Sequence, residues 1–165
     1  GTTEATVAVN MYEDVAQSAL VNTRWRFATN QKVLNQLSAE PTGRYDLAYQ
    51  LPSDLLMLHA VTVNDNLIDY QMYGDKVFAD TSTQDVVIAD YSFRANEETW
   101  PSYFTLAVEF SLAIIFATSI ARDANLASLM TARAEATMAK ARTMDSQQQT
   151  TRKLVTSRFL TARRS

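Results

Sequence analysis

The sequence predicts an α+β protein that is mainly helical: a helical bundle with an inserted small antiparallel β-meander and a flexible C-terminal tail. Apolar residues recur at helical spacing near both ends of the chain, and they alternate with polar residues in the middle, as in strands. The chain has 165 residues, and 47% of them are hydrophobic, which suits one domain around one core. We therefore expect a single domain over residues 1–146 and an extension over residues 147–165.

The first helix is expected over residues 4–22. Four apolar residues recur at every fourth position and share one face of that helix: Val7, Met11, Val15 and Ala19. After it, from Arg24 to Phe27, cationic and aromatic residues alternate. The next segment, residues 28–37, fits either an extended strand or a short helix.

The β-insertion is expected over residues 55–93, as three or four short antiparallel strands. A turn signal with proline and glycine at residues 40–43 precedes it. Apolar and alternating runs predict strands near residues 56–63, 68–72, 76–79 and 87–93. The Gly74-Asp75 pair predicts a tight hairpin between the second and third of them.

A second helix is expected over residues 101–121. Pro101 fits its first turn, and Thr99 or Ser102 would cap it. The segment is apolar nearly all round, so we expect it to be central and buried in a soluble assembly. It is slightly short for a membrane span and contains Glu109, so no membrane is expected as a partner.

A third helix is expected over residues 124–144, after a break at Arg122-Asp123. Seven alanines in this segment favour a helix and would let neighbouring helices approach closely. The domain is then followed by a segment without acidic residues, from Ser146 to the end of the chain.

The C-terminal extension differs in charge from the rest of the chain. The net charge is −3, yet the extension has five basic residues interleaved with apolar ones. This pattern fits either a solubilising end or a segment that becomes ordered on a partner, with apolar side chains buried and arginines facing carboxylates. The acidic remainder of the chain would repel the phosphate backbone of DNA.

No catalytic residue, metal site or cofactor is expected. The chain has no cysteine and one histidine, which excludes thiolate chemistry and multi-histidine zinc sites. His59 is expected on one strand face with Met57, Val61 and Val63, as a packed and hydrogen-bonded residue without a nucleophile nearby. The three glycines lie far apart, which excludes a glycine-rich phosphate loop.

Five aromatic residues near helix boundaries have two interpretations: Trp25, Phe27, Trp100, Tyr103 and Phe104. Rings of this kind can stack on nucleic-acid bases. At helix boundaries, however, large aromatic side chains usually close a core, and the acidic body opposes nucleic-acid binding. We expect them in the core.

Three motifs occur in a fixed order along residues 5–145. They are Trp25-x-Phe27, then Tyr-Gln-Leu-Pro-Ser-Asp with Leu51 and Pro52, then Trp100-Pro101-x-x-Phe104 before an apolar helix and an alanine-rich one. In this order the chain resembles the tail tubular protein A family, the gateway or head-to-tail adaptor proteins of short-tailed phages.

The resemblance implies a structural virion protein at the head–tail junction, made in the host cytoplasm. It implies a ring of about twelve copies that binds the portal protein and a tail nozzle or other tail protein, around DNA that passes without sequence specificity. In related adaptors the C-terminal segment reaches the portal. The residues expected to bind portal here are Arg152, Lys153, Leu154, Arg158, Phe159, Leu160, Arg163 and Arg164.

Two other functions stay open from the sequence. One is another head-completion or neck protein of a tailed phage, which tail morphology in a micrograph would distinguish. The other is a nucleic-acid-binding module acting through the basic extension, which salt-sensitive DNA binding would reveal.

Overall fold

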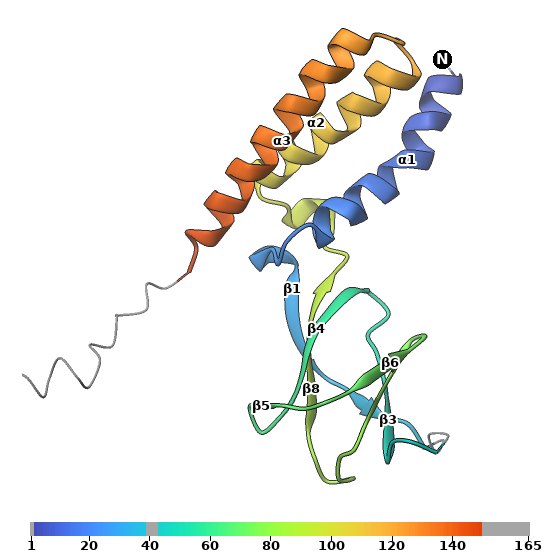
Figure 1. The fold of residues 1–165 in the computed structure, drawn as a ribbon, viewed down its shortest axis with the longest axis vertical. Coiled ribbons are helices and arrows are strands. Elements are labelled where there is room, and N and C mark those ends of the chain that lie inside the picture. The colour runs from blue at the N-terminus through green and yellow to red at the C-terminus, as the bar shows by residue number, and fades with distance from the viewer. Residues whose placement is uncertain (1, 39–42, 150–165) are drawn as a thin grey trace, which may run out of the picture.

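The protein has a helical half and a β half, each with its own core (Figure 1). The computed structural model describes residues 2–38 and 43–149. It is 46% helical and 25% strand, and its strands form two four-stranded antiparallel sheets. The prediction of a helical bundle with a small β-insertion is therefore wrong, because the strands form two sheets with a core of their own.

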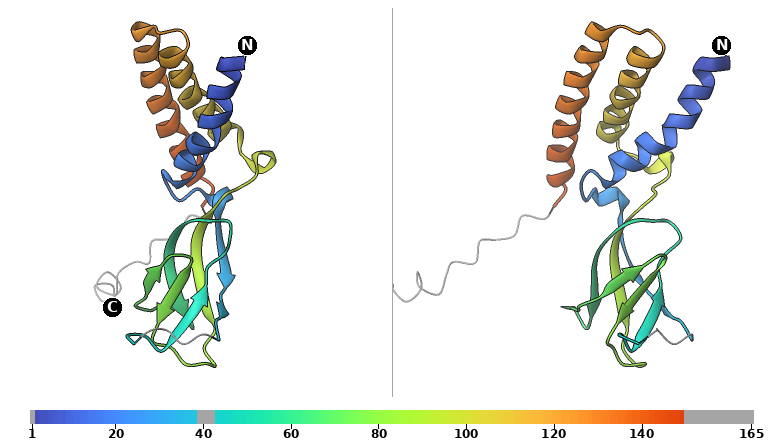
Figure 2. Two further views of the ribbon diagram at one scale, coloured as in Figure 1. Left: turned by 90° about the vertical axis from the view of Figure 1, so that its right-hand side faces the viewer. Right: turned by 45° about the vertical axis from the view of Figure 1, so that its right-hand side comes forward.

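The helical half contains three α-helices: α1 (Thr2–Val21), α2 (Ser102–Ser119) and α3 (Ala124–Ser146). All three were expected within about two residues of these bounds. Helix α2 lies between the other two and packs along α3, whereas the N-terminal half of α1 diverges from α2 (Figure 2). Two short 3-10 helices, η1 (Arg26–Ala28) and η2 (Glu97–Thr99), flank the β half in the chain.

The boundaries of α2 and α3 follow from local chemistry. Pro101 occupies the N-cap of α2 without a side-chain cap, and the Thr99 hydroxyl donates to the Asn96 carbonyl instead. The expected cap by Thr99 or Ser102 is therefore wrong. At the start of α3, the Asp123 carboxylate accepts from the backbone N–H groups of Asn125 and Leu126, each at 3.0 Å. A cap of this kind contributes about 1 kcal/mol.

Two sheets make up the β half. The first has the order β1-β8-β4-β5, with β1 (Thr29–Val33), β8 (Val87–Phe93), β4 (Leu55–Val63) and β5 (Asn66–Leu67). The second has the order β2-β3-β7-β6, with β2 (Asn35–Gln36), β3 (Leu47–Gln50), β7 (Lys76–Ala79) and β6 (Gln71–Tyr73). The chain passes from one sheet to the other at Leu34, whose N–H donates to the Val87 carbonyl at 2.8 Å.

The expected meander over residues 55–93 is also corrected. Strands β1, β2 and β3 lie before residue 55, and the ambiguous segment 28–37 forms two of them. Strand β1 pairs with β8, so that Thr29 lies opposite Ser92. Its residues are mostly polar because it is an edge strand, and an edge strand shows no apolar alternation in the sequence.

The hairpin expected at Gly74-Asp75 is confirmed, and a second hairpin precedes it. Asn64 and Asp65 have φ angles of 50° and 63° between β4 and β5, the left-handed conformation of a two-residue hairpin loop. Gly74 has a φ angle of 59° between β6 and β7. A side chain would be strained at that angle, which explains the glycine.

Candidate interaction surface

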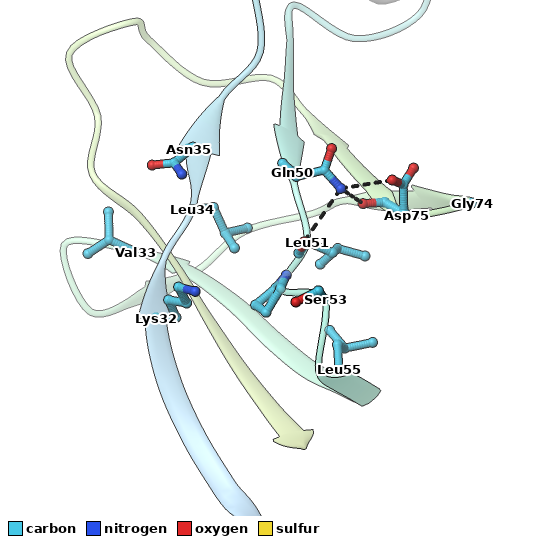
Figure 3. A pocket seen from close by; sticks show the side chains of 11 residues that line it. Lys32, Val33, Leu34, Asn35, Gln50, Leu51, Ser53, Leu55, Gly74 and Asp75 are labelled. Carbon is cyan, nitrogen blue, oxygen red and sulfur yellow. Dashed lines mark hydrogen bonds between the residues drawn. The ribbon is translucent and has the colours of Figure 1, made fainter. Parts of the chain in front are cut away.

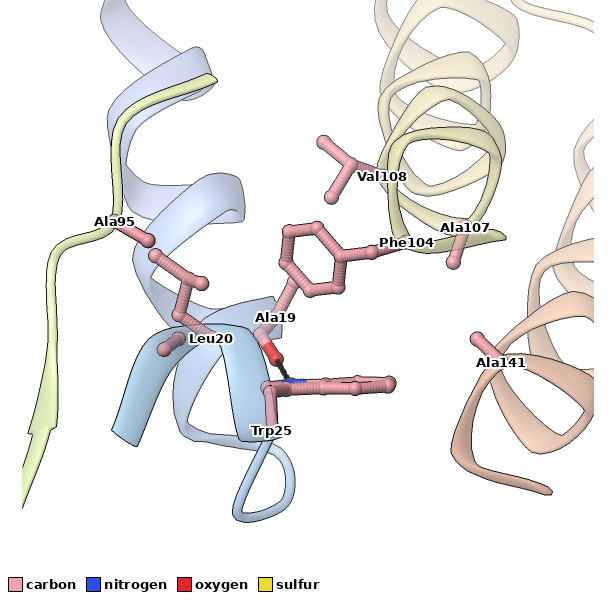
Figure 4. Packing of buried hydrophobic residues seen from close by; sticks show 9 residues of the cluster. Ala19, Leu20, Trp25, Ala95, Phe104, Ala107, Val108 and Ala141 are labelled. Atoms are coloured by element: carbon pink, nitrogen blue, oxygen red, sulfur yellow. Dashed lines mark hydrogen bonds between the residues drawn. The ribbon is translucent and has the colours of Figure 1, made fainter. Parts of the chain in front are cut away.

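The first and third motifs meet where the helical half joins the β half (Figure 4). The Phe104 ring contacts the rings of Trp25 and Trp100, with centroids 5.1 and 4.9 Å apart. The Phe27 ring lies 4.9 Å from that of Phe104. The Trp25 indole N–H donates to the Ala19 carbonyl at 2.7 Å, which fixes the indole ring against the end of α1.

These aromatic side chains close a core. Trp25 and Phe104 have no exposed surface, and their faces are covered by neighbouring side chains. A base could not stack on them without unfolding this junction. Tyr103 and Trp100 are half-buried at its edge, and Pro101 lies beside them at the start of α2.

A charged network holds α1 to the segment after β8. The guanidinium of Arg94 donates to both carboxylate oxygens of Glu13, at 2.7 and 3.0 Å, and also to Glu97. The hydrogen bonds from Arg94 lower the pKa of Glu13 to about 2. The same guanidinium lies 5.4 Å from the centre of the Trp100 ring, so charge and aromatic packing support one another.

A second polar junction fixes the end of α3. The Asp145 carboxylate is buried and accepts from the Tyr103 hydroxyl at 2.9 Å and from the Arg26 backbone N–H at 3.1 Å. The Arg26 side chain returns a bond to the Asp145 carbonyl. Burial and the hydrogen bond to Asp145 raise the pKa of Tyr103 to about 12. The chain therefore leaves α3 from a point that is tied to the start of the β half.

The second motif lines a groove between the two sheets (Figure 3). The groove has a volume of about 620 Å³, and Leu51 and Pro52 lie on one wall of it. Gln50 spans its edge, and its amide donates to the carbonyl and carboxylate of Asp75, both at 2.9 Å. Lys32, Asn35 and Ser53 are the other polar residues of its lining.

The residues that the structure describes contain no cluster of three or more side chains able to hold a metal ion. The one histidine does have a possible nucleophile beside it, contrary to expectation. His59 Nε2 and the Ser92 hydroxyl are 2.7 Å apart. Ser92 is only 1% exposed, so the pair joins β4 to β8 out of reach of a substrate.

The expected grouping of His59 with its neighbours is corrected too. Irregularities in the pairing of β4 with β8 flank residues 56 and 59, so the strict alternation along β4 is broken. Met57 pairs opposite Ser92, whereas Val61 pairs opposite Ala89, an odd number of positions away. Met57 therefore lies on the other face from Val61 and is exposed.

The largest unexplained feature is an apolar surface on α2 and α3. Four large apolar side chains on it are at least one third exposed: Leu106, Phe116, Leu126 and Leu129. We call these four residues the apolar surface. The expected burial of α2 is not met within one chain, because only 22% of that helix is buried. Contacts with a partner would bury these side chains further.

By length and composition α2 could also cross a membrane. One such helix is weak evidence, since the core helix of a soluble protein passes the same test. Glu109 lies in the middle of it, and α3, which packs against it, exposes the charged side chains of Arg133, Glu135 and Lys140. A covering of protein fits this surface better than lipid.

The eight residues expected to bind portal all lie in residues 150–165, outside the described part of the chain. The last described residues, Gln147 to Gln149, follow α3 directly and hydrogen-bond back to its last turn. The extension therefore begins next to the junction of Asp145 and Tyr103.

Comparison with protein-family models gave no match, and comparison with curated proteins gave none either. Two features of the fold were missed from the sequence. The apolar surface looked like core, since periodicity does not show which apolar face is covered. Asp145 looked like an ordinary polar residue, although an acid is disfavoured at the C-terminus of a helix unless it has a partner.

Proposed function

We propose that this protein is a structural virion protein: a ring-forming head-to-tail adaptor that joins the portal to the tail and lines part of the DNA channel. The specific role, a head-to-tail adaptor, comes from the resemblance of its three motifs to the tail tubular protein A family. The fold supports it in a general way, because two of those motifs form the junction between the halves and the other lines the groove between the sheets.

The observation that carries the proposal is the apolar surface on α2 and α3. Full burial of a leucine or phenylalanine side chain contributes about 1.5–3 kcal/mol, and these side chains are only partly buried in one chain. Contacts between copies would bury the remainder. The surface thus supports a protein that functions in an assembly, as a ring subunit does.

The charges fit the passage of DNA. Between residues 29 and 93, leaving out the undescribed 39–42, eight aspartates outnumber the three basic residues Lys32, Arg44 and Lys76. The β half therefore carries a net charge of −5 with the histidine neutral. An acidic wall would repel the phosphate backbone, so that DNA would slide rather than bind.

The basic extension supplies the proposed contact with portal. Its five basic residues would face carboxylates on the portal, while Leu154, Phe159 and Leu160 would fill apolar pockets. Because the junction at Asp145 fixes the point where it leaves the domain, all copies in a ring would present it at equivalent positions. Twelve weak contacts would then add up to a stable attachment.

The test is the mass of the purified protein, alone and mixed with the portal protein of the same genome, by native mass spectrometry. The proposal expects a complex with about one copy per portal subunit. A chain that ends at Gln149 keeps the hydrogen bonds of α3 and is expected to lose the complex. No complex with the full chain at any salt concentration would overturn the adaptor function.

A matched pair of variants separates the two kinds of tail contact. In one, the five basic residues of the extension are changed to alanine, and in the other its leucines and phenylalanine are changed to serine. Both are expected to weaken portal binding. Salt-sensitive binding to DNA that is lost only with the basic residues would instead favour the nucleic-acid-binding module.

A further inference from the structure

One side of α3 carries exposed apolar and basic residues. Spacings of three, four and seven residues place five exposed side chains on that side: Leu126, Leu129, Arg133, Lys140 and Met144. We call them the α3 stripe. It contains two cations and no acid.

The α3 stripe points away from α1. The residues of α3 that face α1 lie elsewhere on the helix, as shown by Arg142, whose guanidinium donates to the Asn22 side chain at the end of α1. The residues that face α2 are the buried Ala127, Ala134 and Ala141. The stripe is therefore a separate side of α3, open to a partner.

A groove of complementary character lies between α1 and the α2–α3 pair. Its floor is formed by Val15, Ser18, Ser111, Ile114 and Met138. Toward its N-terminus α1 diverges from α2 (Figure 2). Met11 and Asp14 lie seven and four residues before Ser18 on the same side of α1, and both are exposed.

The groove carries more acid than the α3 stripe. Glu135 and Arg142 line it from α3, and Asp14 lies on α1 four residues before Ser18, which lines it from that helix. Glu13, the neighbour of Asp14, is bound to Arg94 and points elsewhere. The α3 stripe would bring Arg133 and Lys140 to these acids and leucine side chains to the apolar floor of the groove.

We propose that the α3 stripe of one copy packs into the groove between α1 and the α2–α3 pair of the next copy, with Arg133 and Lys140 facing Asp14. The stripe and the groove lie on different sides of the helical half, so the contact is head-to-tail. A contact of that kind closes into a ring when the rotation between copies allows it. The inference rests on the proposed function, because it names the surfaces through which the ring forms.

Disulfide trapping tests this contact directly, since the chain has no cysteine of its own. Two single-cysteine variants, Asp14→Cys and Arg133→Cys, are mixed with portal and oxidised. The expected product is a cross-linked dimer that contains one of each, and the double variant should give a ladder of higher multimers. Lys76→Cys, on an exposed strand of the β half, replaces Asp14→Cys in the control and should give no link to Arg133→Cys.

Charge exchange gives an independent measurement. Arg133→Glu is expected to weaken self-association by about tenfold or more, because it places like charges together at the interface. Asp14→Lys added to the same chain should restore most of the loss.

The outcomes separate this contact from the proposed function. Suppose that the copies assemble at the expected mass, but no cross-link forms and Arg133→Glu has no effect. This result would overturn the proposed contact and leave the adaptor function standing. A chain that stays monomeric with and without portal would overturn both.

Discussion

The hydroxyl of Tyr103, in the first turn of α2, donates a hydrogen bond of 2.9 Å to the buried carboxylate of Asp145, in the last turn of α3. The same carboxylate accepts from the backbone N–H of Arg26, before the first strand. Three segments that are far apart in the sequence thus meet at one acid. The helical half, the β half and the start of the C-terminal extension share this point.

Replacing Asp145 by alanine is expected to lower the free energy of unfolding by about 2–3 kcal/mol, because it leaves a part-buried N–H and a hydroxyl without an acceptor. Tyr103→Phe removes the bond to Asp145 and a longer, exposed bond from the Gln148 amide at 3.4 Å, and it should cost about 1 kcal/mol. Urea denaturation measures both. Ser146→Ala, on the exposed neighbouring residue, serves as the control. Equal stability of Asp145→Ala and the control would contradict this role.

Two phenylalanines on α2 should behave in different ways. Phe104 is fully buried among Trp25, Phe27 and Trp100, so Phe104→Ala is expected to destabilise the fold by about 3–5 kcal/mol. Phe116 belongs to the apolar surface and is 37% exposed, so Phe116→Ala should destabilise the fold less than Phe104→Ala and should weaken assembly.

Thermal unfolding and sedimentation of the two variants make the comparison. A Phe116→Ala protein that unfolds as readily as Phe104→Ala would show that this residue belongs to the core. A Phe116→Ala protein that assembles like the parent would show that its side chain lies outside the contacts between copies.

Acid should weaken the attachment of α1. Arg94 lowers the pKa of Glu13 from 4.5 to about 2, so the folded protein holds this carboxylate charged where the unfolded chain would protonate it. The stabilisation is complete above about pH 4.5 and is lost as the pH falls toward 2. The effect is small, since half of the Glu13 side chain is exposed.

Glu13→Gln is the variant that checks this, and hydrogen exchange of α1 is the measurement. The parent should lose protection of α1 on acidification within that window, and the variant should show low protection throughout. Asp14→Asn changes a carboxylate on the next residue without touching Arg94 and is the control. An identical pH profile for Glu13→Gln and the parent would exclude the ion pair as the cause.

The helices could be predicted closely because their signals are local. Pro101 at the start of α2, the break at Arg122-Asp123 and the spacing of apolar residues in α1 all lie within a few residues of the boundaries that they set. The hairpins at Asn64 and Gly74 are local in the same sense.

The β half could not be predicted as fully because its partners are distant. Thr29 in β1 pairs with Ser92, and Leu47 in β3 pairs with Ala79, so no short window contains both members of a pair. The irregular pairing of β4 also breaks the alternation that the sequence implies, which placed Met57 on the wrong face. The polar junction at Asp145 depends on three such distant segments and was missed for the same reason.

The final prediction concerns His59, whose pKa is lowered by burial and by the charge of Arg24. The folded protein therefore favours the neutral imidazole, so the stabilisation is complete above the ordinary pKa of 6.5 and is lost as the pH falls below it. His59→Gln does not titrate and can still bond to Ser92, so it should flatten the dependence of stability on pH between about 7 and 5. Urea denaturation across that range measures the slope. Because histidine is the side chain that ordinarily titrates there, an unchanged slope in the variant would place the titrating group elsewhere.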